Sequence, residues 1–262
     1  MTAAKTTTSK PTGVTTKPDG TITFPLTLTK DAVATEYQHV LREVATTIEL
    51  KGFRKGKAPL NMVERSVDKN KLYSHVLEHA LPPVYAKVVA ENKLQPLVEP
   101  RITPKTMEEG KDWEFDVEVA GKPEVALGDY EKYLKGLKVE VKDDKKDKAD
   151  DAKLTAVFDA LLKNAKIDVA PLLVDIEARS ALSKLVNQLS SLQLSVQDYA
   201  KSIKKTEEEL VKEYQTTALT NLRLEFILDA LVSARSPEVK ETEPRAKYAA
   251  QRKAVLDYLL AL

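Results

Sequence analysis

The residues best suited to chemistry lie in one short basic segment, Lys51–Pro59, which reads Lys-Gly-Phe-Arg-Lys-Gly-Lys-Ala-Pro. Four cations fall within seven residues around one aromatic ring. Such cations contact phosphates, and an aromatic ring stacks on a base or fills an apolar pocket. Two glycines permit positive φ, so the segment can project as a sharp loop. The pattern predicts a docking tip for a surface that mixes RNA and protein, and its residues are Gly52, Phe53, Arg54, Lys55, Gly56 and Lys57. A solvated basic turn between two helices is the alternative.

Two sharper phosphate-binding motifs are excluded in this segment. A phosphate-cradling P-loop needs Ser or Thr after Gly-Lys, whereas Ala58 follows Lys57 here. The RNA-binding KH loop has the spacing Gly-x-x-Gly, whereas three residues separate Gly52 from Gly56.

A second group of chemically active residues is His75, Glu78 and His79, which matches the H-x-x-E-H pattern of one class of zinc hydrolases. Two histidines four residues apart share one helix face, as two zinc ligands must. A catalytic zinc also needs a third ligand and an open position, and no downstream motif nominates one. His39, the remaining histidine, has no motif around it. We therefore expect no metal site and no cofactor, and a zinc metallohydrolase remains only as an alternative function.

Strands are expected on both sides of the basic segment. Thr21–Lys30 alternates apolar and polar residues, which predicts a strand with one buried face. Pro25 falls on the other face, which favours an edge strand. Two later stretches, Leu97–Thr103 and Trp113–Val119, alternate in the same way. Together with the helices below they predict an α+β module.

Helices are expected immediately before and after the basic segment. Apolar residues recur at helical spacing up to about Leu50, and again from about Leu72 to Val88. Pro82 and Pro83 lie inside the second stretch. A proline in a helix interior removes a hydrogen bond and clashes with the preceding turn, so we expect a kink or a break there.

From Ala152 onward the sequence indicates helices only. Glycine is absent after Gly136, which favours continuous helices. Thr206 and Glu209 have the spacing of a capping box and predict the start of a long helix. Ser236-Pro237 predicts its end near Arg235.

The second half of this long helix carries apolar residues on more than one face. They are Leu222, Leu224, Phe226, Ile227, Leu228, Leu231 and Val232. One neighbouring helix cannot cover all of them, so either several helices surround this one or some apolar surface stays open. An open apolar patch marks a binding surface. On that interpretation Leu222, Phe226 and Ile227 are candidate contacts for unfolded polypeptides.

The composition limits the partners and the compartment. The 262 residues carry a net charge of +1, so binding to a polyanion requires a local patch. Cysteine is absent, which excludes disulfides and thiol chemistry and suits a reducing compartment. The first twenty residues lack the apolar run of a secretory signal, and no stretch reaches the roughly 18 apolar residues of a membrane helix. We expect a cytoplasmic protein without membrane contact.

The basic segment also resembles a known family. Gly52, Phe53, Arg54, Gly56, Lys57 and Pro59 match the Gly-Phe-Arg-x-Gly-Lys-x-Pro signature of the ribosome-binding domain of trigger factor. Phe158–Asn187 is similar to a helix, corner and helix of that family's C-terminal domain, with Ala170 as one extra residue. The resemblance implies a ribosome-associated, ATP-independent chaperone. Its loop would dock against a tunnel-exit ribosomal protein and rRNA, and its helical arms would shelter nascent and unfolded polypeptides.

One departure from the family is plain in the sequence. The family's FKBP-like prolyl isomerase domain sits between the connector and the helical domain, and only about Lys138–Asp150 occupies that place here. A β-rich catalytic domain needs far more residues. We therefore expect no isomerase activity and no catalytic residues.

These inferences give a two-part architecture. We expect a disordered tail over residues 1–20, an α+β ribosome-binding domain over 21–125, a connector and charged linker over 126–151, and an all-α domain of antiparallel helices over 152–262. A ribosome-bound maturation factor without client binding is a further alternative function.

Overall fold

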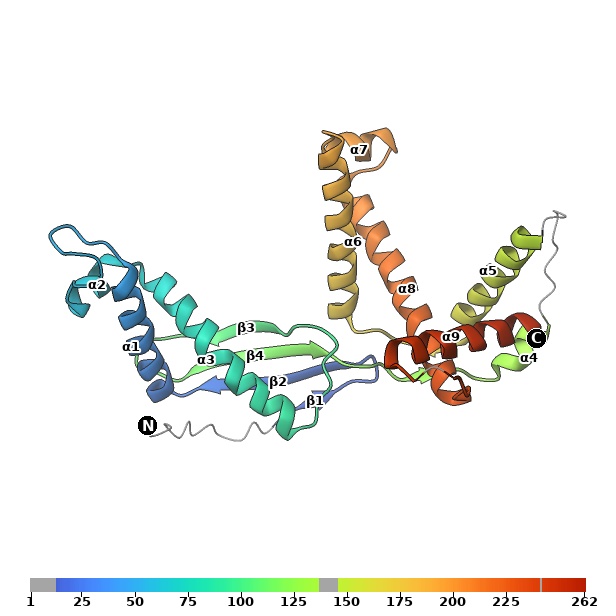
Figure 1. Cartoon of the computed structure of the whole chain (residues 1–262), viewed down its shortest axis with the longest axis horizontal. Coiled ribbons are helices and arrows are strands. Elements are labelled where there is room, and N and C mark those ends of the chain that lie inside the picture. Colours follow the sequence, from blue (N-terminus) through green and yellow to red (C-terminus); the bar gives the residue numbers. More distant parts are fainter. Residues whose placement is uncertain (1–12, 137–145, 241) are drawn as a thin grey trace. The chain divides into compact units, whose positions relative to one another are not determined.

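The computed structural model describes residues 13–136, 146–240 and 242–262 (Figure 1). The chain divides into two compact units. The first unit comprises residues up to Thr16 together with Ile22–Gly121. The second comprises Lys17–Thr21 and Lys122–Leu262. The boundary between the units thus differs slightly from the one expected at residue 125.

The first unit is built on a four-stranded sheet with the strand order β1-β2-β4-β3. These strands are β1 (Thr15–Thr16), β2 (Thr21–Leu28), β3 (Arg101–Thr106) and β4 (Trp113–Ala120). The β1–β2 and β3–β4 pairs are antiparallel. The two-residue strand β1 pairs only with Ile22 and Thr23, so it stops short of Pro25. The placement of Pro25 accords with its lack of a backbone N–H.

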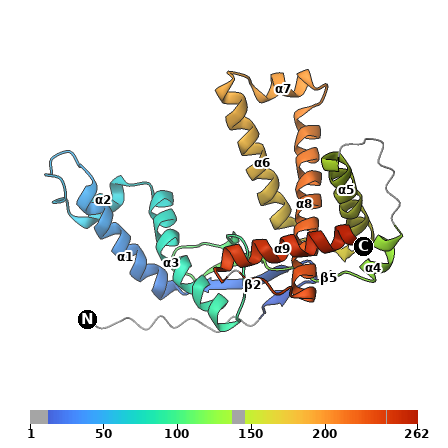
Figure 2. The ribbon, with the colours of Figure 1, turned by 45° about the vertical axis from the view of Figure 1, so that its right-hand side comes forward.

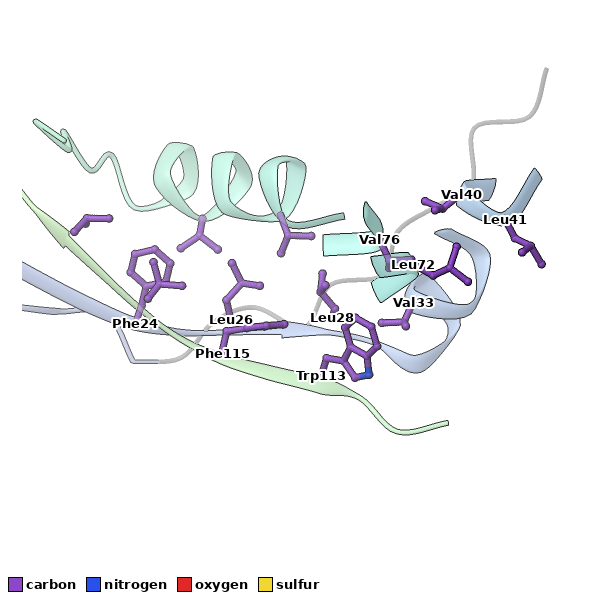
Figure 3. Packing of buried hydrophobic residues seen from close by; sticks show 14 of the residues in the cluster. Phe24, Leu26, Leu28, Val33, Val40, Leu41, Leu72, Val76, Trp113 and Phe115 are labelled. Carbon is purple, nitrogen blue, oxygen red and sulfur yellow. The ribbon is translucent and has the colours of Figure 1, made fainter. Parts of the chain in front are cut away.

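The core of this unit lies between one face of the sheet and its helices. Alternate residues of β2 and β4 are buried, whereas those between them face outward. Figure 3 shows the rings and methyl groups of Phe24, Leu26 and Phe115 on the same side, facing a helix. Trp113 is 1% exposed and meets the ring of Tyr73 edge-on, at 5.2 Å between centroids. Strand alternation therefore predicted the buried face correctly.

Three helices complete the first unit: α1 (Lys30–Thr47), α2 (Leu60–Ser66) and α3 (Lys69–Glu91). Helix α3 contains Pro82 and Pro83 without interruption, so the break considered for this position does not occur. Val76 on one side of the prolines and Val84 and Val88 on the other are all buried. This packing holds both halves of the helix in place and offsets the missing backbone hydrogen bonds.

The expectation of a disordered tail over residues 1–20 is wrong for its last part, and residues 1–12 lie outside the described structure. Thr15 and Thr16 form β1, and the following turn is closed by a hydrogen bond from Lys17 N to Thr21 O of 2.8 Å. Such a short strand has no alternating pattern of its own. It forms because β2 offers a free edge for pairing.

The second unit is mainly helical. Its longer helices are α5 (Lys146–Asn164), α6 (Pro171–Ser191), α8 (Glu207–Arg235) and α9 (Pro244–Ala261), and a short helix, α7, spans Val196–Ser202. Helices α6 and α8 run side by side in opposite directions, with α7 across their far end (Figure 2). We call α6, α7 and the first half of α8 the arm. Helices α5 and α9 pack against the other half of α8.

The stretch expected to be a connector belongs to the second unit. Strand β5 (Val125–Ala126) pairs with β6 (Lys166–Ile167), and helix α4 (Tyr130–Lys135) packs on α5. Glu131 of α4 accepts hydrogen bonds from Tyr258 (2.7 Å) and Arg235 (3.2 Å), and these partners hold the pKa of its carboxyl below the ordinary value. The connector prediction was therefore wrong up to Lys135. Residues 137–145 of the predicted linker lie outside the described residues, and Lys146–Asp151 begin α5.

The capping box at the start of α8 is present as predicted. Thr206 Oγ1 accepts a hydrogen bond from Glu209 N at 3.1 Å, and Glu209 Oε2 accepts one from Thr206 N at 2.9 Å. Replacing Thr206 by alanine should lower the free energy of unfolding by about 1 kcal/mol, because one orphan N–H loses its partner. Urea unfolding followed by helical circular dichroism measures the change.

A matched control for this substitution lies on the same helix. Thr216 is exposed, and its hydroxyl donates to the carbonyl of Lys212, which is already bonded within the helix. Alanine has a higher helix propensity than threonine, so Thr216→Ala should not destabilise the protein. Equal destabilisation by the two substitutions would contradict the role of the cap.

Candidate functional site

The basic segment forms a projecting loop between α1 and α2, at the end of the first unit that Figure 1 draws farthest from the sheet. Two tight turns shape it. Phe53 N donates to Leu50 O at 3.0 Å, and Lys57 N donates to Arg54 O at 2.9 Å. Around it, Ile48, Leu50, Ala58 and Leu60 pack against the core of the unit. The loop is thus anchored at both ends and projects between them.

Glycine is required at both turn positions. Gly52 has a φ of 92° and Gly56 a φ of 74°, which are strained for any side chain. At Gly56 a Cβ atom would also lie 3.2 Å from the carbonyl oxygen of Thr46, at the end of α1. The spacing of the glycines therefore fixes how Phe53, Arg54 and Lys55 are presented.

Every predicted docking residue from Gly52 to Lys57 is exposed. Phe53 leaves 39% of its surface in solvent. Lys51, Arg54, Lys55 and Lys57 form no ion pair with any residue that the structure describes. The loop therefore presents unneutralised positive charge beside an uncovered aromatic ring. This combination can bind phosphates and insert a ring into an apolar pocket at the same time.

The residues of the H-x-x-E-H motif do not converge. Among the described residues, the one group of three potential metal ligands consists of Glu36, His39 and His79. His75 instead pairs with Glu78, with 3.1 Å between Nδ1 and Oε2, on an exposed face of α3. The sequence therefore indicated the wrong partners for His79. Nothing local could have shown the right ones, because Glu36 and His39 lie on α1, 40 or more residues earlier.

The candidate client contacts on α8 need correction. Ile227 is 0% exposed and Phe226 8% exposed, and only Leu222 is partly accessible. Helices α5, α6 and α9 and strand β5 all contact α8. Of the two possibilities left open by the sequence, the structure therefore shows surrounding helices at this place. Phe226 and Ile227 stabilise the unit and have no surface to offer a client.

Exposed apolar side chains lie elsewhere on the second unit, on the arm. Leu192 is 68% exposed, and six further residues are at least one-third exposed: Ile176, Val186, Leu194, Ile203, Val211 and Leu219. Three of them, Leu192, Leu194 and Ile203, lie in or beside the turns on either side of α7. The arm has a small core of its own around Leu185, Leu189 and Leu210. Sequence reasoning missed this surface, because it indicated only helices from Ala152 onward and predicted no turn between Leu189 and Thr206.

The fold and its exposed surfaces define a two-part protein: an α+β unit presents a basic loop, and a helical unit presents exposed apolar side chains on its arm. A family model described as "Bacterial trigger factor protein (TF)" matches residues 12–161, and one described as "Bacterial trigger factor protein (TF) C-terminus" matches residues 131–255. The chain belongs to the trigger factor family.

Curated relatives match about half of the chain's residues. This chain is 36% identical over 126 residues to a trigger factor of Streptococcus mutans, and 37% identical over 137 residues to one of Streptococcus suis. These alignments cover 48% and 52% of this chain but only 28% and 31% of the relatives. The matched part is therefore less than a third of the relatives' length.

A solved structure has the same fold over nearly the whole chain. Its title is "Promiscuous Substrate Recognition in Folding and Assembly Activities of the Trigger Factor Chaperone". The two chains superpose with a TM-score of 0.60 at 12% identity, over 95% of this chain and 99% of the other. The family resemblance and the predicted fold class, an α+β domain followed by a helical domain, are confirmed.

The predicted lack of the isomerase domain is also confirmed. The two family matches overlap over residues 131–161, so no stretch between them is left for an inserted catalytic domain.

No helix in the described part of the chain is long and apolar enough to span a membrane.

Proposed function

We propose that this protein is a ribosome-associated chaperone that docks beside the polypeptide exit tunnel through Lys51–Lys57 and holds emerging chains on its arm. The observation that carries the proposal is the exposure of the family's signature loop. Phe53 and four cations that pair with no described residue are presented together, on glycine turns that a side chain would strain. Rigid presentation lowers the entropy cost of binding. A cytoplasmic location follows from this role.

The docking chemistry divides between the two kinds of side chain. Arg54, Lys55 and Lys57 neutralise rRNA phosphates, which gives a salt-dependent term. Phe53 fills an apolar pocket of a ribosomal protein, and its contribution to the binding free energy is not weakened by salt. The proposal therefore predicts binding that falls with salt but does not vanish. Co-sedimentation with purified ribosomes over a salt series tests it.

Holding is assigned to the apolar residues of the arm. Leu192, Leu194 and Ile203 are not adjacent in the sequence, and each is exposed, so each makes a small apolar contact. Several weak contacts suit many clients and allow rapid release. Release then follows when the client buries its own apolar segments, and it needs no ATP. A ribosome-bound maturation factor would dock in the same way but would carry no nascent chains, which sequencing of the bound chains distinguishes.

We expect no prolyl isomerase activity. The family's catalytic domain is missing, and the remaining surfaces are suited to binding. The protein should not accelerate the cis/trans isomerisation of a short X-Pro peptide, whose uncatalysed time constant is on the order of tens of seconds or longer. A protease-coupled or NMR exchange assay measures this. A concentration-dependent acceleration, retained after further purification, would contradict the assignment.

A further inference from the structure

A cluster of two imidazoles and one carboxylate joins α1 to α3, and the proposed docking function does not use it. Glu36 and His39 lie on α1, and His79 lies on α3. Glu36 Oε1 is 3.3 Å from His39 Nδ1 and 3.6 Å from His79 Nδ1. One ligand atom from each residue lies within 4.8 Å of the others. Three donors from two helices therefore point at one small volume.

These distances fit a tetrahedral metal ion. Zinc binds imidazole nitrogen and carboxylate oxygen at about 2.0–2.2 Å, so adjacent ligand atoms of a tetrahedron lie about 3.3–3.6 Å apart. The two separations from Glu36 Oε1 already have this length. The imidazole rings, 6.2 Å apart between centroids, need only a small side-chain rotation to close the third edge. Both are exposed, so such a rotation disturbs no packing.

We propose that Glu36, His39 and His79 bind a divalent transition metal, with zinc as the best match, and that the ion ties α1 to α3. Imidazole and carboxylate together favour zinc and its neighbours over magnesium or calcium, which prefer oxygen ligands alone. The fourth position faces solvent and takes a water molecule. Without metal, the Glu36 carboxylate lies within ion-pair distance of both imidazoles.

The site lies where it can steady the docking loop. Helix α1 ends at Thr47, directly before the loop, and α1 packs on α2 and α3. A metal that binds only the folded unit stabilises it by mass action. Metal binding should therefore raise the unfolding temperature of the first unit, although the loop itself contributes no metal ligand.

Zinc titration of the tag-free, full-length protein tests the proposal, because the chain supplies a matched control. The three histidines are His39, His75 and His79, and His75 lies on the same helix as His79 but outside the cluster. Isothermal titration with ZnCl₂ should give one site. Zinc affinity should fall at least about tenfold in His39→Ala and His79→Ala, because each loses a ligand. Even the mutation of residues that only hydrogen-bond to metal ligands lowers metal affinity by about 10–100-fold. His75→Ala should bind as the wild type does.

A second measurement does not depend on whether His39→Ala and His79→Ala fold. Zinc in excess should raise the unfolding temperature of the wild type and of His75→Ala by several degrees, whereas magnesium should not. Glu36→Gln, which keeps the size of the side chain, should lose most of this rise. No zinc binding, or binding that depends on His75 and not on His39, overturns the proposal and leaves only a cluster of a carboxylate and two imidazoles.

Discussion

A protein in which Phe53, Arg54 and Lys55 are all replaced by alanine should lose ribosome binding by about a hundredfold or more. A central aromatic anchor contributes about 2 kcal/mol or more to an interface, and each 1.4 kcal/mol is a factor of ten in Kd. The two cations add phosphate contacts. Co-sedimentation with ribosomes at several protein concentrations gives the Kd of each variant.

The fold should survive this triple substitution. All three side chains are exposed, and the hydrogen bonds that close the turns involve backbone atoms only. A matched control removes one exposed apolar side chain and two exposed lysines from the same unit, outside the loop: Leu97→Ala, Lys71→Ala and Lys93→Ala. The control should bind normally. If both triple variants sediment with ribosomes as the wild type does, the loop is not the anchor.

The single variant Lys57→Ala separates charge from shape in the same assay. Lys57 directly follows Gly56, the glycine of the second turn, and lies four positions after Phe53. Its loss should weaken binding less than the triple substitution. It should also lower the slope of log K against log salt by about one phosphate contact.

Replacing Leu192, Leu194 and Ile203 by serine should remove most of the ability to hold unfolded polypeptides. Each exposed side chain contributes about 1 kcal/mol when a client covers it, so the loss of three weakens a client complex by about a hundredfold. Light scattering of an aggregation-prone enzyme diluted from denaturant measures the effect. The variant should need a correspondingly larger molar excess to suppress aggregation.

Two comparisons make this result specific. The polar triple Lys184→Ser, Gln188→Ser and Lys201→Ser changes the same arm at exposed positions and should hold clients normally. Ile227→Ala creates a cavity in the core instead, and should cost about 2–5 kcal/mol of stability. Unchanged suppression by the folded serine variant would show that the arm does not hold clients.

The loop was predictable because its properties are local. Glycine spacing sets the turns, and a run of cations cannot be buried without partners, so exposure followed from residue types. The same holds for the capping box of Thr206 and Glu209 and for the alternation in β2 and β4. The capping box and the strand alternation depend only on residues close together in the sequence, and the structure confirms both.

The errors concern contacts between distant segments. Residues 15–16 and 125–126 form strands only because another strand edge lies beside them, and two residues show no period. Helix α3 passes through Pro82 and Pro83 because buried valines on both sides hold it to the core. Propensity alone favoured a break, and packing decided against it.

The sequence by itself determined which side chains are apolar, charged or conformationally permissive, and therefore where the loop and the helices lie. It could not determine what covers an apolar face. Phe226 and Leu192 are equally apolar in a list of residues, yet one is enclosed by neighbouring helices and the other stands 68% exposed beside α7. His39 and His79 likewise meet only because α1 packs on α3. Burial and convergence are properties of neighbours in space, and the periodicity of one segment carries no information about those neighbours.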